Sequence, residues 1–173
     1  MLPHVEPHFR RTMFTDDIRS GSVGERIFIE DFLDFLNIEY EDVTGRQCFR
    51  LIDTDFKMPI GMYEVKANYK DDKQLVIEEY TNYNKLLAPI SKGWFYKSKA
   101  DLIVFVSRAT RAMILLPFTE EFKAHYESIK NDYPLVLNRI SENNGRKWQS
   151  AYRRVPLDRM GGFFSYYKKE AQP

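Results

Sequence analysis

The sequence predicts a mixed α/β fold of the α+β-like kind, in which helices flank a central mixed β-sheet. Three observations support this prediction: an amphipathic segment near the start, a series of short alternating runs after it, and a nearly continuous apolar run followed by a second amphipathic segment. This order is typical of a sheet that is covered by helices. At 173 residues, the chain has the length of one domain with a packed core.

The first helix is expected over residues 23–37. Ser22 followed by Glu25 is a capping-box pattern, which marks the start of a helix. The residues before it, 1–17, contain prolines and no hydrophobic period, so we expect an N-terminal arm followed by a single domain over 18–173. Apolar side chains recur at helical spacing along one face of the helix, and they are Phe28, Ile29, Phe32, Phe35 and Leu36.

Short alternating runs after this helix predict three strands. "CFRLIDTDF", "GMYEVKANY" and "KQLVIEEY" are separated by "KMPI" and "KDDK", which predicts an antiparallel meander. "DLIVFVS" is apolar along nearly its whole length, so we expect a strand that is covered on both faces. "AMILLPF" predicts a further strand, and "TEEFKAHYESIKNDY" predicts a helix that Thr119 caps. The aromatic and basic remainder permits no assignment.

Composition excludes several classes of protein. The net charge of +1 does not by itself indicate a polyanionic partner. Cys48 is the only cysteine, so no disulfide can form within the chain and a reducing compartment is expected. No apolar run has the length of a signal-peptide core or of a membrane span. We therefore expect a cytoplasmic protein without a membrane partner.

Charged residues interrupt the second predicted strand. Glu64 and Lys66 are separated by a single residue, so they share one face of that strand. Asp53 and Asp55 share one face of the preceding strand, and a tight connection through residues 57–60 would bring Asp55 beside this pair. Burying such charges is costly unless they are paired or bind something.

A divalent cation would explain this arrangement. Two carboxylates that are brought together repel each other unless a cation lies between them. Mg²⁺ takes oxygen ligands, commonly one or two carboxylates, and completes its shell with water and phosphate oxygen. Lys66 would add positive charge near an attacking water and the charge that develops on the phosphorane. The pattern therefore predicts metal-assisted hydrolysis of a phosphodiester.

The order of Asp55, a short hairpin and Glu64-Val65-Lys66 resembles the PD-(D/E)XK nuclease superfamily. More specifically, "YEVKANYKDDKQLVIEEY" followed by "GWFYKSKADLIVFV" is similar to a group of small nucleases from phages and mobile elements. The resemblance covers residues 22–107. Thr54 stands where the family carries the proline of its "PD" motif.

This resemblance implies a restriction-endonuclease-like core and a deoxyribonuclease that uses Mg²⁺, with Mn²⁺ able to substitute. Asp55 and Glu64 would bind the metal, and Lys66 would orient or activate the water. Glu25 would complete the site from the first helix, and Asp53 stays open as an alternative metal ligand. DNA is the implied partner. A homodimer also stays open, because many nucleases of this type pair to cut both strands.

Each of these residues also has a purely structural interpretation. Glu64 and Lys66 would form a weak ion pair at a solvent-facing strand edge. Glu25 would only close the capping box with Ser22. The matching alternative for the function is a non-catalytic nucleic-acid-binding or regulatory module on the same scaffold.

Several further residues are candidates for an accessory role. Glu78 and Glu79 end the third predicted strand, and alternation alone does not say which of them faces the site. Lys97 is a candidate phosphate contact, whereas Asp101, at the start of the buried run, is expected to be structural. The basic segment "RKWQSAYRRVP", residues 146–156, is the candidate surface for contacting a nucleic-acid backbone.

Overall fold

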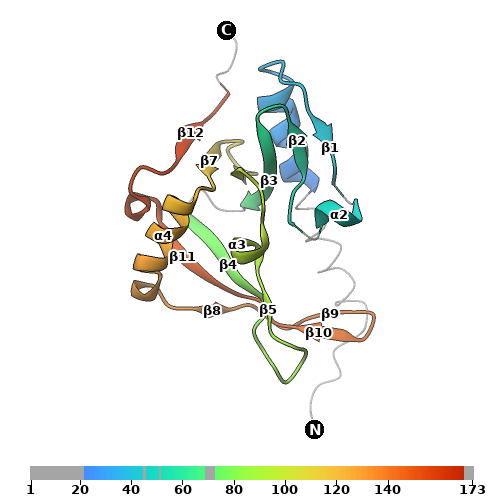
Figure 1. The fold of residues 1–173 in the computed structure, drawn as a ribbon, viewed down its shortest axis with the longest axis vertical. Coiled ribbons are helices and arrows are strands. Elements are labelled where there is room, and N and C mark those ends of the chain that lie inside the picture. Colours follow the sequence, from blue (N-terminus) through green and yellow to red (C-terminus); the bar gives the residue numbers. More distant parts are fainter. Residues whose placement is uncertain (1–21, 45, 51, 69–72, 170–173) are drawn as a thin grey trace.

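The computed structural model describes residues 22–44, 46–50, 52–68 and 73–169, so the arm expected at 1–17 lies outside the described residues. These described residues form two β-sheets and a separate two-stranded hairpin, with helices packed on the sheets (Figure 1). The predicted α/β class with a central mixed sheet is confirmed.

The central sheet has six strands. In their order across the sheet, they are β1 (Glu41–Asp42), β2 (Phe56–Met58), β3 (Gly61–Asn68), β6 (Leu102–Ser107), β7 (Met113–Pro117) and β12 (Ser165–Tyr167). β3 and β6 run parallel, whereas the other neighbouring pairs in this sheet are antiparallel. The strands predicted from "DLIVFVS" and "AMILLPF" are thus confirmed as β6 and β7.

A second, antiparallel sheet has four strands. Across this sheet they follow the order β5 (Ser91–Lys92), β4 (Gln74–Asn82), β11 (Ala151–Pro156) and β8 (Val136–Leu137). β9 (Ser141–Asn143) and β10 (Arg146–Trp148) form the separate hairpin. β4 lies in the crossover between the parallel strands β3 and β6. Its partner β11 comes from the C-terminal third of the chain.

The predicted three-stranded meander is therefore wrong. Of the three runs, only those that contain β2 and β3 pair with each other, with Phe56 opposite Tyr63. The other edge of β3 is taken by β6, in a register that places Glu64 opposite Ile103. Because both edges of β3 are occupied, β4 finds no partner there and pairs with β5 and β11 instead.

The segment "CFRLIDTDF" is also not a strand over most of its length. It begins in a short helix, α2 (Gln47–Arg50), and Ile52 and Asp53 lie in a turn. Asp53 has a φ of +45°, in the left-handed region, which interrupts any extended run. Strand structure starts only at Phe56 in β2.

The first helix is shorter than the predicted range 23–37. Residues 22–28 are α-helical and continue into a π-helical turn, η1 (Ile29–Leu33). The chain then leaves the helix, and Asn37 has a φ of +53°, which a continuous right-handed helix excludes. Phe35, which was expected on the buried face, is accordingly 42% exposed.

The second predicted helix is confirmed as α4 (Glu120–Ile129). Thr119 caps it, because its hydroxyl oxygen accepts a hydrogen bond from the Phe122 N–H at 3.2 Å. Further helical segments are short, and they are α3 (Trp94–Lys97), η2 (Lys130–Asp132) and η3 (Leu157–Met160). No helix within the described ranges has the length and apolar character needed to cross a bilayer.

Two hydrophobic clusters pack on opposite faces of the central sheet. One joins β6 and β7 to the second sheet, α3 and α4, and includes Leu75, Ile77, Phe95, Ile103, Phe105, Phe122 and Tyr126. The other joins β6 and β7 to helix 22–28, β2 and β3, and includes Phe28, Phe56, Tyr63, Val65, Val104 and Val106. Alternate residues of β6 enter different clusters, which confirms that this strand is covered on both faces.

Candidate functional site

The β2–β3 hairpin brings Asp55 to the Glu64-Val65-Lys66 segment. Asp55 directly precedes β2, and its backbone N–H donates to the Tyr63 carbonyl at 2.9 Å, which extends the hairpin pairing by one residue. Asp55 Oδ2 accepts a hydrogen bond from the Val65 N–H at 2.8 Å. The Asp55 carboxyl is therefore held against the backbone between Glu64 and Lys66.

Glu64 is a buried acid with one paired and one unpaired oxygen. It lies on β3, inside the central sheet, and is 4% exposed. The Lys66 ammonium forms an ion pair with Glu64 Oε1. Glu64 Oε2 is buried and has no hydrogen-bond donor among the residues that the structure describes. Leaving such an atom unsatisfied costs free energy, so this oxygen is well suited to bind a cation or a water.

The two carboxyls hold protons more tightly than isolated acids do. Burial is the main cause that raises the pKa of Asp55 to about 6, with Lys66 opposing the rise and Glu25 adding to it. Burial also raises the pKa of Glu64 to about 7, with Lys66 opposing the rise and Asp55 adding to it. Burial alone would lower the pKa of Lys66, but the facing acids, Glu64 first, outweigh it and raise that pKa. Lys66 is therefore charged, and a cation that replaced the protons would stabilise both carboxylates.

Glu25 reaches the site from helix 22–28. Gly24 allows this helix to approach β3 closely, because a Cβ at that position would lie only 2.9 Å from the Cβ of Ala67. Burial raises the pKa of Glu25, and neighbouring acids that include Glu64 add to the rise. The Glu25 carboxyl thus interacts through space with the Glu64–Lys66 pair across the contact between helix and strand.

Asp53 pairs with α3 rather than with β3. Its positive φ places it in a turn, so the expectation that it shares a strand face with Asp55 is wrong. The Asp53 carboxylate forms an ion pair with Lys97 at 3.0 Å, and the Ser98 hydroxyl donates to the Asp53 carbonyl at 3.0 Å. Of the two aspartates, Asp55 is the one whose carboxyl contacts the backbone of the E-x-K segment.

A cleft of about 560 Å³ lies between β3 and the second sheet. It includes Lys66, whose Nζ lies 5.8 Å from the centroid of the Trp94 ring. Tyr152 and Arg154 of β11 lie on its far wall. Both residues belong to the segment 146–156, which was expected to form a basic surface. The sequence did not single out Tyr152, because its place in the cleft depends on pairing between distant strands.

Glu78 and Glu79 point to opposite sides of β4. Glu78 lines the cleft, and its pKa is raised chiefly by burial. Glu79 is 2% exposed and accepts hydrogen bonds from the Tyr126 hydroxyl at 2.7 Å and from Arg153 Nε at 2.9 Å. Glu78 is therefore the candidate for an accessory role, and Glu79 holds the core.

Asp101 supports the hairpin that carries the site. Its Oδ2 accepts a hydrogen bond from the Met62 N–H at 2.8 Å. Gly61 has a φ of +147°, and a Cβ there would lie 2.7 Å from the same Asp101 oxygen. These contacts agree with the structural role that was expected for Asp101.

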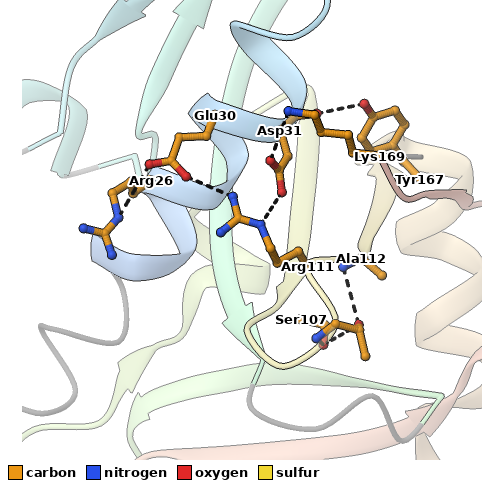
Figure 2. Close-up of polar contacts among 9 residues, drawn as sticks. Arg26, Glu30, Asp31, Ser107, Arg111, Ala112, Tyr167 and Lys169 are labelled. Carbon is orange, nitrogen blue, oxygen red and sulfur yellow. Dashed lines mark hydrogen bonds and ion pairs between the residues drawn. The ribbon is translucent and has the colours of Figure 1, made fainter. Parts of the chain in front are cut away.

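A second charged cluster, which the sequence patterns did not predict, holds η1 to the segment between β6 and β7. Arg111, with a φ of +56°, lies in that segment, and its Nε donates to Asp31 Oδ2 at 2.5 Å. Its second guanidinium contact reaches Glu30 Oε2 at 2.9 Å (Figure 2). The Tyr167 hydroxyl donates to the Asp31 carbonyl at 2.8 Å. The sequence did contain one hint of this contact. Asp31 lies among the apolar residues of the predicted helix, and an acid in that position needs a basic partner such as Arg111.

The hairpin offers two carboxyls that fit a divalent cation. Asp55 and Glu64 supply the oxygens, and Glu64 Oε2 lacks a donor in the described part of the chain. Within the described residues, no three acidic, histidine or cysteine side chains form a ready-made set of metal ligands. Mg²⁺ is commonly held by one or two carboxylates, with water and phosphate oxygen filling the other positions, so this pair is sufficient in kind.

Comparison of the chain with protein-family models, curated proteins and solved structures gave no match. The function is therefore inferred from the geometry of the hairpin and the cleft, together with the motif resemblance.

Proposed function

We propose that the protein is a divalent-cation-dependent nuclease that hydrolyses DNA phosphodiester bonds by the PD-(D/E)XK mechanism, on a restriction-endonuclease-like core. The observation that carries this proposal is the convergence of Asp55, Glu64 and Lys66 at one hairpin. The buried Glu64 Oε2, without a donor in the described ranges, supports a cation at this place. A mixed sheet with helix 22–28 packed against it supports the core.

The side chains divide the work of this reaction. Asp55 and Glu64 would hold the ion, and a bound Mg²⁺ would polarise the phosphate and lower the pKa of an attacking water. Lys66 keeps its charge beside Glu64 and would stabilise the negative charge that builds on the phosphate oxygens. Glu25 would complete the site from the helix by accepting hydrogen bonds from water.

One observation favours a second candidate, a non-catalytic nucleic-acid-binding or regulatory module. Lys66 pairs directly with Glu64 and so occupies one of the oxygens that a metal would use. A divalent cation and the ammonium would compete for this acid. The two candidates differ in whether a metal binds through Glu64 and whether DNA is cut.

Cleavage assays test the nuclease proposal. Plasmid, linear and branched DNA are incubated with Mg²⁺, with Mn²⁺ or with EDTA, using the wild type, Glu64→Ala and Lys66→Ala. We expect metal-dependent cleavage by the wild type and a rate at least roughly 100-fold lower in each variant, because one group that stabilises developing charge contributes on that order. Lys57→Ala, at an exposed lysine of β2, is the matched control and should cut like the wild type.

Folding and metal binding are measured alongside cleavage. Circular dichroism shows whether Lys66→Ala is folded, and Mg²⁺ should raise the melting temperature of the wild type but not that of Glu64→Ala. Folded Lys66→Ala that cuts at the wild-type rate would remove the mechanism. A wild type that cuts none of these substrates and shows no metal-dependent shift would favour the binding module.

A further inference from the structure

The second sheet turns one face toward the site and the other toward the core. The register between β4 and β11 places Tyr152 opposite Glu78 and Arg154 opposite Val76, and all four residues line the cleft. On the other face, Ile77 is fully buried in the core. On this side, the cleft is thus lined by Val76 and by three polar or aromatic side chains, none of which belongs to the hydrophobic clusters.

Tyr152 and Arg154 form a cation–π pair on this wall. The Arg154 guanidinium lies 5.6 Å from the centroid of the Tyr152 ring. Tyr152 is half-buried and Arg154 is exposed, so both present surface to a ligand in the cleft. Sites for single-stranded nucleic acid combine these two groups, because the ring stacks on a base and the cation contacts a phosphate.

The opposite wall carries Lys66 and Trp94 and leads to the hydrolysis site. The cleft joins Lys66 of β3 to Tyr152 of β11, and Lys66 pairs with Glu64, so a nucleotide bound at Tyr152 would lie beside the Glu64–Lys66 pair. Its volume of about 560 Å³ lies in the range of small-molecule pockets. A cleft of that size has room for an unstacked base and its phosphate.

We propose, on the basis of the nuclease function above, that this cleft takes an unpaired nucleotide next to the scissile phosphate. The base stacks on Tyr152, and a neighbouring phosphate contacts Arg154. The substrate class is therefore DNA that contains a single-stranded segment, such as a free single strand, a flap or a branch. Fully paired duplex would engage the hydrolysis site without the Tyr152 contact.

Binding in the absence of cleavage tests this inference. Fluorescence anisotropy in EDTA measures the affinity of the full chain for a labelled short oligothymidylate and for a duplex of the same length. We expect Tyr152→Ala to raise the Kd for the single strand about tenfold, on the scale of stacking by one aromatic ring, and to leave the duplex Kd unchanged. Tyr152→Phe keeps the ring and should match the wild type. Tyr166→Ala, at a tyrosine of β12 that is 56% exposed, is the control and should also match it.

Two outcomes would overturn the inference: an unchanged single-strand Kd in Tyr152→Ala, or equal losses on both DNAs. Circular dichroism checks the fold of the variant. Tyr152→Leu, which keeps apolar volume without an aromatic ring, takes its place if the alanine variant does not fold. Arg154→Gln should reduce the slope of log affinity against log salt by about 0.7, as expected when one phosphate contact to a single strand is lost. An unchanged slope would remove Arg154 from the phosphate contact.

The readout separates this inference from the nuclease proposal, because it needs neither metal nor cleavage. A wild type that binds the oligothymidylate through Tyr152 but never cuts DNA would contradict the nuclease proposal alone. Metal-dependent cleavage with no role for Tyr152 would contradict this inference alone.

Discussion

At the scale of single residues, the main feature is a pair of buried carboxyl groups with raised pKa values. Asp55 and Glu64 both have raised pKa values, with burial as the main cause, and Lys66 offsets only part of the rise. Placing ionised carboxylates in such a position destabilises the fold, since desolvation and mutual repulsion both disfavour the charged forms. A cation that binds both acids removes this penalty, and the proposed nuclease function requires such a cation.

This balance predicts that the metal-free protein loses stability as the pH rises. Raised pKa values mean that the folded chain binds protons at Asp55 and Glu64 more tightly than the unfolded chain does. Their contribution to stability is fully present below about pH 4, near the pKa values of free acids, and is lost as the pH rises through the folded-state values. The melting temperature in EDTA should therefore fall between about pH 5 and about pH 8.

Glu64→Gln is the matched variant for this prediction, because it removes one titrating group and keeps the shape of the side chain. Differential scanning fluorimetry in the same buffers should show a smaller fall for Glu64→Gln than for the wild type. Mg²⁺ should flatten the wild-type profile, since a bound cation replaces the protons. Identical pH profiles for both proteins would contradict the assignment of the raised pKa to Glu64.

Hairpin geometry explains which site residues could be predicted from the sequence. Alternation along β3 and a short connection to β2 are local features, so the proximity of Asp55, Glu64 and Lys66 could be predicted. Asp53 was placed wrongly, because the alternating pattern that predicted a strand extends back into a turn, where Asp53 has a left-handed φ. The effect of Glu25 on the site depends on a helix–strand contact that the sequence does not specify.

Among the secondary-structure elements, α3 owes its place to a glycine. A Cβ at Gly93 would lie 2.4 Å from the Glu78 carbonyl oxygen, and the Gly93 N–H donates to the Glu79 carbonyl at 2.7 Å. This close approach sets Trp94 in the core and brings Lys97 to Asp53. The Gly-Trp pair in "GWFYKSKADLIVFV" thus positions one wall of the cleft.

We expect Gly93→Ala to lower the free energy of unfolding by about 1–3 kcal/mol, because the added methyl group pushes α3 away from β4. Urea denaturation measures the change. Ser91→Ala, at an exposed residue of the neighbouring β5, is the control and should unfold like the wild type. Equal stability of Gly93→Ala and the wild type would mean that α3 is not fixed by this contact.

Local patterns also explain which elements were predicted correctly. α4 begins after a capping residue and has apolar side chains at helical spacing, and β6 is itself a continuous apolar run. The partner of β4 could not be predicted, because β11 lies far along the chain in a segment that permitted no assignment. β4 cannot pair with β3 because β6 occupies the edge of β3 that β2 leaves available, and the sequence pattern does not show this parallel pairing.

Across the whole molecule, a buried ion pair joins the crossover to the C-terminal third. Glu79 of β4 accepts hydrogen bonds from Arg153 of β11 and from Tyr126 of α4. Arg153 also donates to the Tyr133 carbonyl. The part of the chain outside the motif resemblance therefore completes the fold that supports the site.

Arg153→Met should lower the free energy of unfolding by about 3–5 kcal/mol, because it leaves the Glu79 carboxylate buried without its cation. Urea denaturation measures the loss, and Arg139→Ala, at an exposed arginine, serves as the control. Adding Glu79→Gln to Arg153→Met should recover part of the loss, since the unpaired carboxylate at position 79 is then removed as well. A stable Arg153→Met protein would show that this pair does not hold the two parts together.

The positions of β11 and β12 bear on how the chain acquires its shape during synthesis. β11 pairs with β4 in one sheet, and β12 pairs with β7 at an edge of the other. Neither sheet can therefore be completed until β11 and β12 emerge from the ribosome. Until then, the edge of β4 that pairs with β11 has unpaired backbone N–H and C=O groups, which can pair with another chain. Cutting the gene back to the segment that bears the motif would make that transient exposure permanent and would remove Tyr152 and Arg154 from the cleft.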